Sequence, residues 1–169
     1  VNSDDLVFSE GLMTAVQSMG QIKNAGVVYG DYYVFTNTIR DGYLVCTPAR
    51  VSMRSLLWGR NQIPGIGTIV RSCLLDDIGW LDCKLEYAMD LDLWIRMSRV
   101  SKLVRVPIPV SAWRAHAGSK TVAFAKHSLS EATDLRERES MIVRVTPKFV
   151  RRIVFDIYRA RFKIERTMR

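Results

Sequence analysis

Three short segments of this chain carry side chains that can bind a divalent cation or move a proton. The segment Asn2–Asp5 ends in two adjacent carboxylates, Tyr87–Trp94 contains Asp90, and Arg114–Lys120 contains His116. Carboxylate oxygens are preferred ligands of hard divalent cations, and a neutral imidazole can complete such a site. A carboxylate beside a cleft can also take a proton from an attacking hydroxyl group. The segments therefore indicate metal-assisted group transfer, provided that the fold brings them together.

Each segment also has an ordinary structural explanation. Asn2–Asp5 can cap a helix, because aspartate is favoured at the N-cap and in the first turn. Asp92 and Trp94 can belong to a solvated helical face with one buried ring. His116 can be a surface or capping residue after a strand, and His127, the other histidine, is assigned to that class. These alternatives remain open at the level of sequence.

The elements that must position these residues follow from periodicity, which changes along the first half of the chain as in a mixed α/β domain. Apolar residues at helical spacing predict helices, and runs of β-branched and aromatic residues predict strands. The expected elements are a helix over 8–23, strands over 27–31 and 32–36, a tight turn at Asp41-Gly42 into a strand over 43–47, a helix over 52–58, a strand over 67–71, and a helix over 74–78 capped by Ser72.

The second half begins with an expected helix over 87–100 whose first turn carries the acids. A strand is expected over 103–113, and Pro107 and Pro109 within it predict a sheet edge or a bend. From Phe124 onward the chain is rich in helix formers and charge, and Thr146-Pro147 predicts a break between two helices.

Length and composition bound the class of protein. A chain of 169 residues with 48% hydrophobic and 25% charged residues is ordinary for one soluble domain. No apolar run approaches the length of a membrane span. Cys46, Cys73 and Cys83 are odd in number and lack CxxC spacing, which favours reduced thiols in the cytoplasm.

Most of the positive charge lies in the last segment of the chain. Residues 147–169 hold eight Lys and Arg against two Asp and Glu, a net charge of +6 out of +8. Val150, Ile153, Val154 and Ile157 follow helical spacing, so the segment predicts a basic amphipathic helix that can lie on an anionic membrane. Its apolar stripe can equally pack on the domain or on a second subunit. Nucleic acid is not expected, because the apolar stripe lacks interleaved exposed aromatic residues and no reader motif is present.

In their order and spacing, these motifs resemble the second half of the catalytic domain of inverting family-2 glycosyltransferases, over about residues 1–122. The resemblance implies an α/β fold: an incomplete nucleotide-diphospho-sugar transferase (A-type) domain with a mixed sheet, followed by a helical, basic amphipathic tail over 123–169. In that family a βαβ unit before the acidic motif holds the nucleotide base. The chain is therefore expected to be a fragment that transfers sugar poorly by itself.

The resemblance also implies roles for individual residues. Asp90 is the expected catalytic base, and Met89 stands where the family usually has a second acid. Asp4 and His116 are the expected ligands of Mn²⁺ or Mg²⁺. The residues expected to bind the donor diphosphate are Asn2, Asp5, Arg114 and Lys120, and Asn2 replaces the family's first acid. The residues expected on the acceptor side, or as structural support, are Asp92 and Trp94.

The function implied is transfer of a sugar, with inversion, from a nucleotide-diphosphate sugar to a glycan or a lipid-linked acceptor. The segment 62–68 resembles the family loop that lines the donor sugar, although a simple turn explains its Pro and Gly equally well. The expected location is the cytoplasm, with the basic tail suited to the inner face of the cytoplasmic membrane. The alternative is a non-catalytic membrane- or protein-interaction module in which the basic C-terminal helix is the working part.

Overall fold

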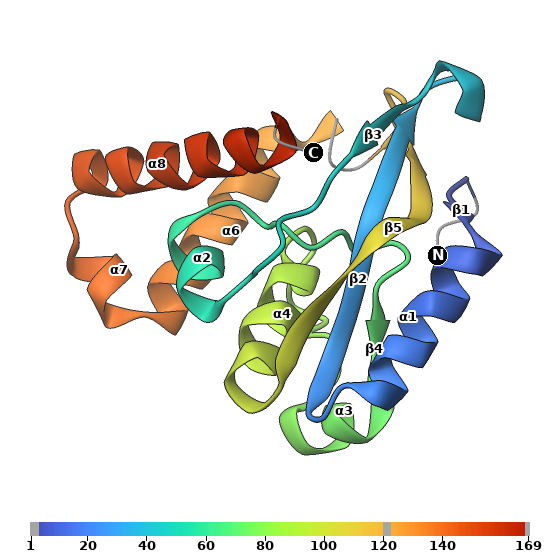
Figure 1. Ribbon diagram of the computed structural model, residues 1–169. Coiled ribbons are helices and arrows are strands. Elements are labelled where there is room, and N and C mark those ends of the chain that lie inside the picture. Colours follow the sequence, from blue (N-terminus) through green and yellow to red (C-terminus); the bar gives the residue numbers. More distant parts are fainter. Residues whose placement is uncertain (1–3, 120–122, 168–169) are drawn as a thin grey trace.

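A mixed five-stranded sheet organises the α/β fold in this computed structural model, which describes residues 4–119 and 123–167 (Figure 1). Only β2 and β5 are parallel to each other, and the other pairs are antiparallel. The order is β1-β5-β2-β3, and β4 pairs with β2 outside this path. The strands are β1 (Leu6–Val7), β2 (Ala25–Phe35), β3 (Tyr43–Val45), β4 (Ile69–Val70) and β5 (Lys102–Arg114).

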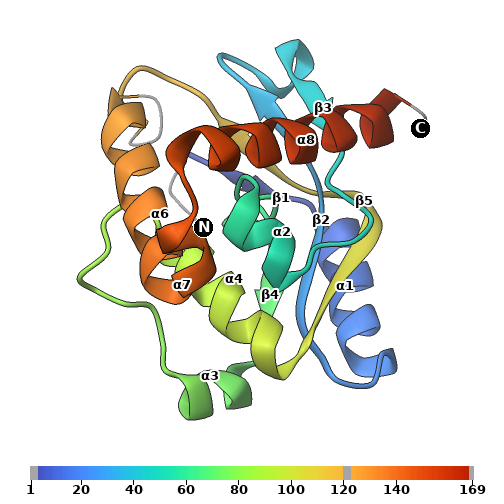
Figure 2. The ribbon, with the colours of Figure 1, turned by 90° about the vertical axis from the view of Figure 1, so that its left-hand side faces the viewer.

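Helices cover both faces of the sheet, and a further helical layer lies on one side (Figures 1 and 2). On one face, α1 (Ser9–Gln21) packs on β2 and β5 around a small core that includes Ala15, Val28 and Val110. The opposite face holds α2 (Met53–Trp58), α3 (Ser72–Ile78) and α4 (Met89–Val100). Beyond them lie α6 (Ala125–Glu139), α7 (Met141–Val145) and α8 (Lys148–Thr167).

The helices after residue 123 share the main core with the sheet. Leu135 of α6 and Val143 of α7 are buried in the same cluster as Leu56 and Ile95. Arg136 is also buried there and donates from Nε to the Leu56 carbonyl at 2.9 Å, which ties α6 to α2. Burial lowers the pKa of the Arg136 guanidinium to about 10. In the described residues, no helix has the length and apolar character needed to cross a bilayer.

Most of the predicted elements are confirmed, and the break at Thr146-Pro147 separates α7 from α8 as expected. The strands expected over 27–31 and 32–36 form one continuous strand, β2, and a 3₁₀ turn over Ile39–Asp41 precedes β3. Ser72 was expected to cap α3, and this prediction is wrong. The helix begins at Ser72 with Arg71 at the N-cap, and no side chain caps it. A further helix end at Ser140 was not predicted.

The two prolines of β5 lie in a stretch of the strand that is open on one side, and they coincide with a break in the pairing on its other side. β5 lies between β1 and β2, but β1 pairs only with Ser111 and Ala112. The pairing with β2 shifts register between Tyr29 and Asp31, and the two prolines of β5 lie opposite this part of β2. Since proline has no N–H to donate to a ladder, the irregular register accommodates it. The prediction that these prolines mark a sheet edge or a bend is confirmed.

α1 lies so close to β5 that one position requires glycine. A Cβ on Gly11 would stand 2.3 Å from the carbonyl oxygen of Pro109, whereas a Cβ on Gly20 of the same helix would meet nothing within 4 Å. We expect Gly11→Ala to lower the free energy of unfolding by about 1–3 kcal/mol, because backbone atoms cannot move aside as a side chain can. Gly20→Ala should raise it by about 0.5–1 kcal/mol, since alanine restricts the unfolded chain and favours helix. Urea denaturation of both variants measures the contrast, and equal effects would contradict this account of the contact.

Candidate active site

The structure brings together Asp4 and His116, the two residues expected to bind a cation. His116 Nε2 lies 2.8 Å from Asp4 Oδ2, although 112 positions separate them in sequence. The contact follows from antiparallel pairing of β1 with β5, in which Leu6 is opposite Ala112. Asp4 precedes β1 and His116 follows β5, so the two side chains meet at the end of this short ladder.

The acids at positions 4 and 5 do not cap a helix. The N-cap of α1 is Phe8, and β1 separates the acids from that helix. Asp5 is buried and accepts a hydrogen bond at 3.2 Å from the backbone N–H of Arg114, which fastens the two segments together. The Arg114 Nε donates to the Thr36 carbonyl at 3.1 Å, at the end of β2. These contacts make the surroundings of Asp4 a junction of three segments.

The ionised form of Asp4 is favoured. The hydrogen bond from His116 lowers the pKa of the Asp4 carboxyl, and the nearby charge of Arg114 adds to the effect. The Gly118 N–H donates to His116 Nδ1 at 3.2 Å, so in this arrangement Nε2 carries the proton shared with Asp4. A cation bound at Nε2 would move the imidazole proton to Nδ1 and release the Gly118 N–H.

The donor set fits a hard divalent cation that keeps other ligands. Adjacent ligands of an octahedral ion with bonds of about 2.1 Å stand about 3 Å apart, close to the 2.8 Å between His116 Nε2 and Asp4 Oδ2. Within residues 4–119 and 123–167, no group of three or more His, Cys, Asp or Glu side chains could hold a metal ion. The protein would thus supply two ligands and leave the rest to water or phosphate oxygens.

Asp90 lies half-buried in the first turn of α4. Its Oδ2 accepts a hydrogen bond from Asn61 Nδ2 at 2.8 Å, and its Oδ1 accepts from the Leu91 N–H at 2.7 Å. Burial raises the pKa of the Asp90 carboxyl, and these two hydrogen bonds oppose the rise only in part. A carboxylate with a raised pKa is a better proton acceptor than an ordinary aspartate.

Glu131 of α6 holds the start of α4 in place. The N-cap of α4 is Ala88, which has no side-chain acceptor. The Glu131 carboxylate accepts from the backbone N–H groups of Glu86, Tyr87 and Ala88 at 2.6–2.9 Å. Burial opposes ionisation of Glu131, but these hydrogen bonds prevail and lower its pKa. A residue more than 40 positions away therefore fixes the turn that carries Asp90.

The loop between α2 and β4 connects Asp90 with β5. Asn61 binds the Asp90 carboxylate, and Gly65 passes beside it, since a Cβ there would stand 3.7 Å from Oδ2. A few residues later the Ile66 carbonyl accepts from Ser111 Oγ at 3.2 Å. Gly67 has φ +68 and touches Ser111 so closely that a side chain would not fit. The loop spans the carboxyl ends of the parallel strands, where ligands of open α/β sheets commonly bind.

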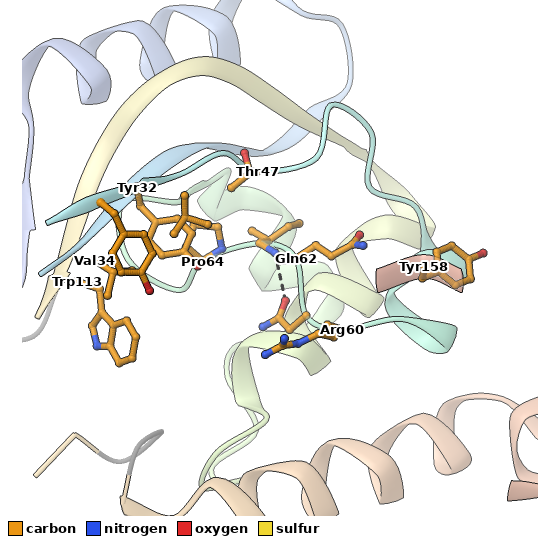
Figure 3. Close-up of a pocket in the computed structure, with 12 residues that line it drawn as sticks. Tyr32, Val34, Thr47, Arg60, Gln62, Pro64, Trp113 and Tyr158 are labelled. Carbon is orange, nitrogen blue, oxygen red and sulfur yellow. Dashed lines mark hydrogen bonds between the residues drawn. The ribbon is translucent and has the colours of Figure 1, made fainter. Parts of the chain in front are cut away.

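A cavity of about 280 Å³ opens beside this loop (Figure 3). Figure 3 shows Tyr32, Val34 and Trp113 of the sheet at one side and Tyr158 of α8 at the other, with Gln62 between them. The cavity also includes Arg60 and Asn61, the residue bound to Asp90. Gln62 Oε1 is buried without a hydrogen-bond partner among the described residues. The lining thus combines aromatic rings with amide groups.

Asp92 and Trp94 lie away from this cavity. Asp92 is buried and pairs with Arg96 at 2.7 Å and with Arg138 of α6 at 3.0 Å, so it is not on a solvated face. Arg96 also donates to the carbonyls of residues 78–80, which ties the loop after α3 to α4. Trp94 is buried in the main core, and its Nε1 has no partner within the described part of the chain. Asn2 and Lys120 lie outside the described residues.

Several residues of this site were not anticipated from the sequence. No local sequence pattern marks Asn61, Glu131 or the cavity residues Tyr32, Trp113 and Tyr158.

Comparisons with known proteins do not identify the chain. A scan against models of protein families found no family that matches it, and a search of curated proteins also found no match. What defines the site is therefore its geometry: an Asp–His pair, a raised-pKa aspartate and an aromatic cavity around one end of an α/β sheet.

Proposed function

We propose that this chain carries the metal-binding and acceptor sides of an inverting glycosyltransferase that uses a nucleotide-diphosphate sugar. The observation that supports it most is the contact between Asp4 and His116. The resemblance names these two residues as ligands of one cation, and neither periodicity nor composition requires them to meet. Three unpaired cysteines agree with a cytoplasmic location, where disulfides are rare.

Asp90 is the proposed catalytic base. An acceptor hydroxyl gives its proton to the Asp90 carboxylate while its oxygen bonds to the anomeric carbon, and the bond from that carbon to the diphosphate breaks on the opposite side. The raised pKa of Asp90 favours this proton transfer, and Asn61 orients the accepting oxygen. Glu131 acts only through the position of α4, so it is a positioning residue.

The Asp4–His116 pair is the proposed cation site, and Asp5 and Arg114 are its supports. A divalent cation held there would neutralise charge that develops on the departing diphosphate. Asp5 fixes the backbone of Arg114, and a guanidinium suits phosphate oxygens. In the resembled family the nucleotide base is held by a βαβ unit before the acidic motif, so activity assays use the full-length protein.

The aromatic cavity is the proposed acceptor side. Tyrosine and tryptophan offer flat apolar faces together with polar edges, and the amides of Asn61 and Gln62 can exchange hydrogen bonds with hydroxyl groups. The unpaired Oε1 of Gln62 needs such a donor, because a buried acceptor without a partner is unfavourable. Asn61 joins this cavity to Asp90, so an acceptor bound here would have its hydroxyl near the base.

Titration calorimetry of Mn²⁺ into the chain, with inorganic diphosphate present, tests the cation site. His116→Ala should weaken Mn²⁺ binding by at least roughly 10-fold, a loss seen even for residues that only support a metal ligand. His127→Ala is the matched control, because His127 is an exposed histidine whose ring lies beside Phe124. Asp4→Asn should behave like His116→Ala. Equal affinities for the His116 and His127 variants would refute the cation site.

A further inference from the structure

Two helices on the outside of the molecule expose a set of large apolar side chains. Figure 2 shows α7 and α8 in front of α2 and α4, with nothing packed over them in the part of the chain described. These side chains are between 55% and 76% exposed, and they are Met141, Ile142, Val145, Phe149, Ile153 and Ile157. We call this set the outer apolar surface.

α8 carries two apolar stripes, and the fold covers only one of them. Val150, Val154 and Tyr158 are half-buried, and Tyr158 contacts Gly59 at the end of α2. The other stripe begins one residue earlier, at Phe149, and continues at Ile153 and Ile157. A step of one residue turns about 100° around a helix. The second stripe therefore faces away from the domain, so packing on the domain does not account for it.

Basic residues run beside the exposed stripe. Arg144, Lys148 and Arg152 are exposed, at a spacing of four residues, and each directly precedes a member of the outer apolar surface. Arg151 pairs with Glu137 on α6, and Arg152 lies 3.4 Å from Asp156 in an exposed pair within α8. The segment 147–169 has a net charge of +6. The outer surface of α7 and α8 thus has adjacent apolar and basic stripes.

We propose that the outer apolar surface docks on an anionic lipid bilayer, with Phe149, Ile153 and Ile157 in the interface and Arg144, Lys148 and Arg152 at the headgroups. An interfacial helix needs this combination of an apolar stripe and flanking Lys or Arg. A second copy of the chain is a poorer occupant, because it would bring two strongly basic segments together.

Docking in this orientation would bring the cavity close to the membrane. Tyr158 lies on the covered stripe of α8 and also lines the cavity. The bilayer and the cavity would therefore contact different sides of the same helix, whose diameter is about 10–12 Å. Membrane docking itself does not depend on the proposed sugar transfer.

Co-sedimentation with lipid vesicles tests the apolar part of the proposal. The unchanged chain should bind vesicles that contain phosphatidylglycerol, and Ile153→Ser with Ile157→Ser should lower the partition coefficient by at least roughly 100-fold, because two large apolar side chains leave the interface. The control is Met13→Ser with Val16→Ser, a pair on α1 that is 62% and 55% exposed and lies on the other face of the sheet. The control pair should leave binding unchanged.

Charge neutralisation and sedimentation velocity complete the test. Arg144→Gln with Lys148→Gln should weaken binding to phosphatidylglycerol vesicles by roughly 30-fold, since each base near such a surface contributes about fivefold. Vesicles of phosphatidylcholine alone should bind weakly in every case. The proposal fails if the isoleucine pair and the α1 pair behave alike. It also fails if the chain forms a dimer that the isoleucine pair abolishes, because the surface would then be a protein interface.

Discussion

Asp90→Asn is expected to lower kcat for sugar transfer by about 10²–10⁴-fold, the usual contribution of a positioned general base. The amide cannot accept the acceptor proton, yet it occupies the same space beside Asn61. The assay follows transfer from a labelled nucleotide sugar by the full-length protein. Asp77→Asn, at an exposed position of α3, is the matched control and should leave kcat unchanged.

Stability and pH dependence separate loss of the base from loss of the fold. Burial raises the pKa of Asp90 in the folded protein, so its contribution to stability is present at low pH and is lost as pH rises through that pKa. Asp90→Asn should therefore change the free energy of unfolding at neutral pH by less than about 1 kcal/mol. The variant loses one hydrogen bond, which destabilises it, but it no longer buries a charge, which stabilises it. In the unchanged protein, kcat/KM should fall toward acidic pH with an apparent pKa above about 4, which is the ordinary pKa of aspartate. An active Asp90→Asn enzyme would end the proposal that Asp90 is the base.

Local patterns were sufficient for most of the helices and strands, but not for β1 or for the helix end at Ser140. Helical spacing of apolar residues marked α1 and α4, and β-branched and aromatic residues marked β2. The helix ends were less predictable. Ser72 has a side chain suited to capping, but Arg71 takes the N-cap position because its guanidinium is held by the Ala25 and Met19 carbonyls. Tertiary contacts of this kind override capping preferences that are worth only about 1 kcal/mol.

The candidate site was predictable only in part. The resemblance brought attention to Asp4, Asp90 and His116, and the ladder of β1 with β5 explains why two of them meet. Asn61 and Glu131 could not be found in this way, because their roles depend on contacts across 29 or more positions of sequence. Periodicity indicates which face of an element is buried, and it contains no information about which distant side chain meets that face.

A buried ion pair beside the cavity was also missed by sequence analysis. Arg105 Nη2 lies 2.7 Å from both carboxylate oxygens of Asp31, and Thr47 donates to Asp31 from its backbone N–H at 2.8 Å. Both charged side chains are at most 7% exposed. Because Thr47 lines the cavity, this network fastens one cavity wall to β2 and β5.

We expect Asp31→Asn to lower the free energy of unfolding by about 3–5 kcal/mol, because Arg105 would keep a buried charge without its partner. Asp156→Asn makes the same chemical change in the exposed pair with Arg152 on α8 and should lower it by less than about 1 kcal/mol. Urea denaturation monitored by circular dichroism compares the two variants.

Combining Asp31→Asn with Arg105→Met distinguishes the loss of the pair from the loss of packing. The double variant buries no charge at this position, so it should recover part of the stability that Asp31→Asn removes. If both single changes and the double change have the same small effect, the network does not hold the wall at Thr47. Recovery of stability in the double variant would show that most of the stability lost in Asp31→Asn is due to the unpaired guanidinium and not to a changed shape of the wall.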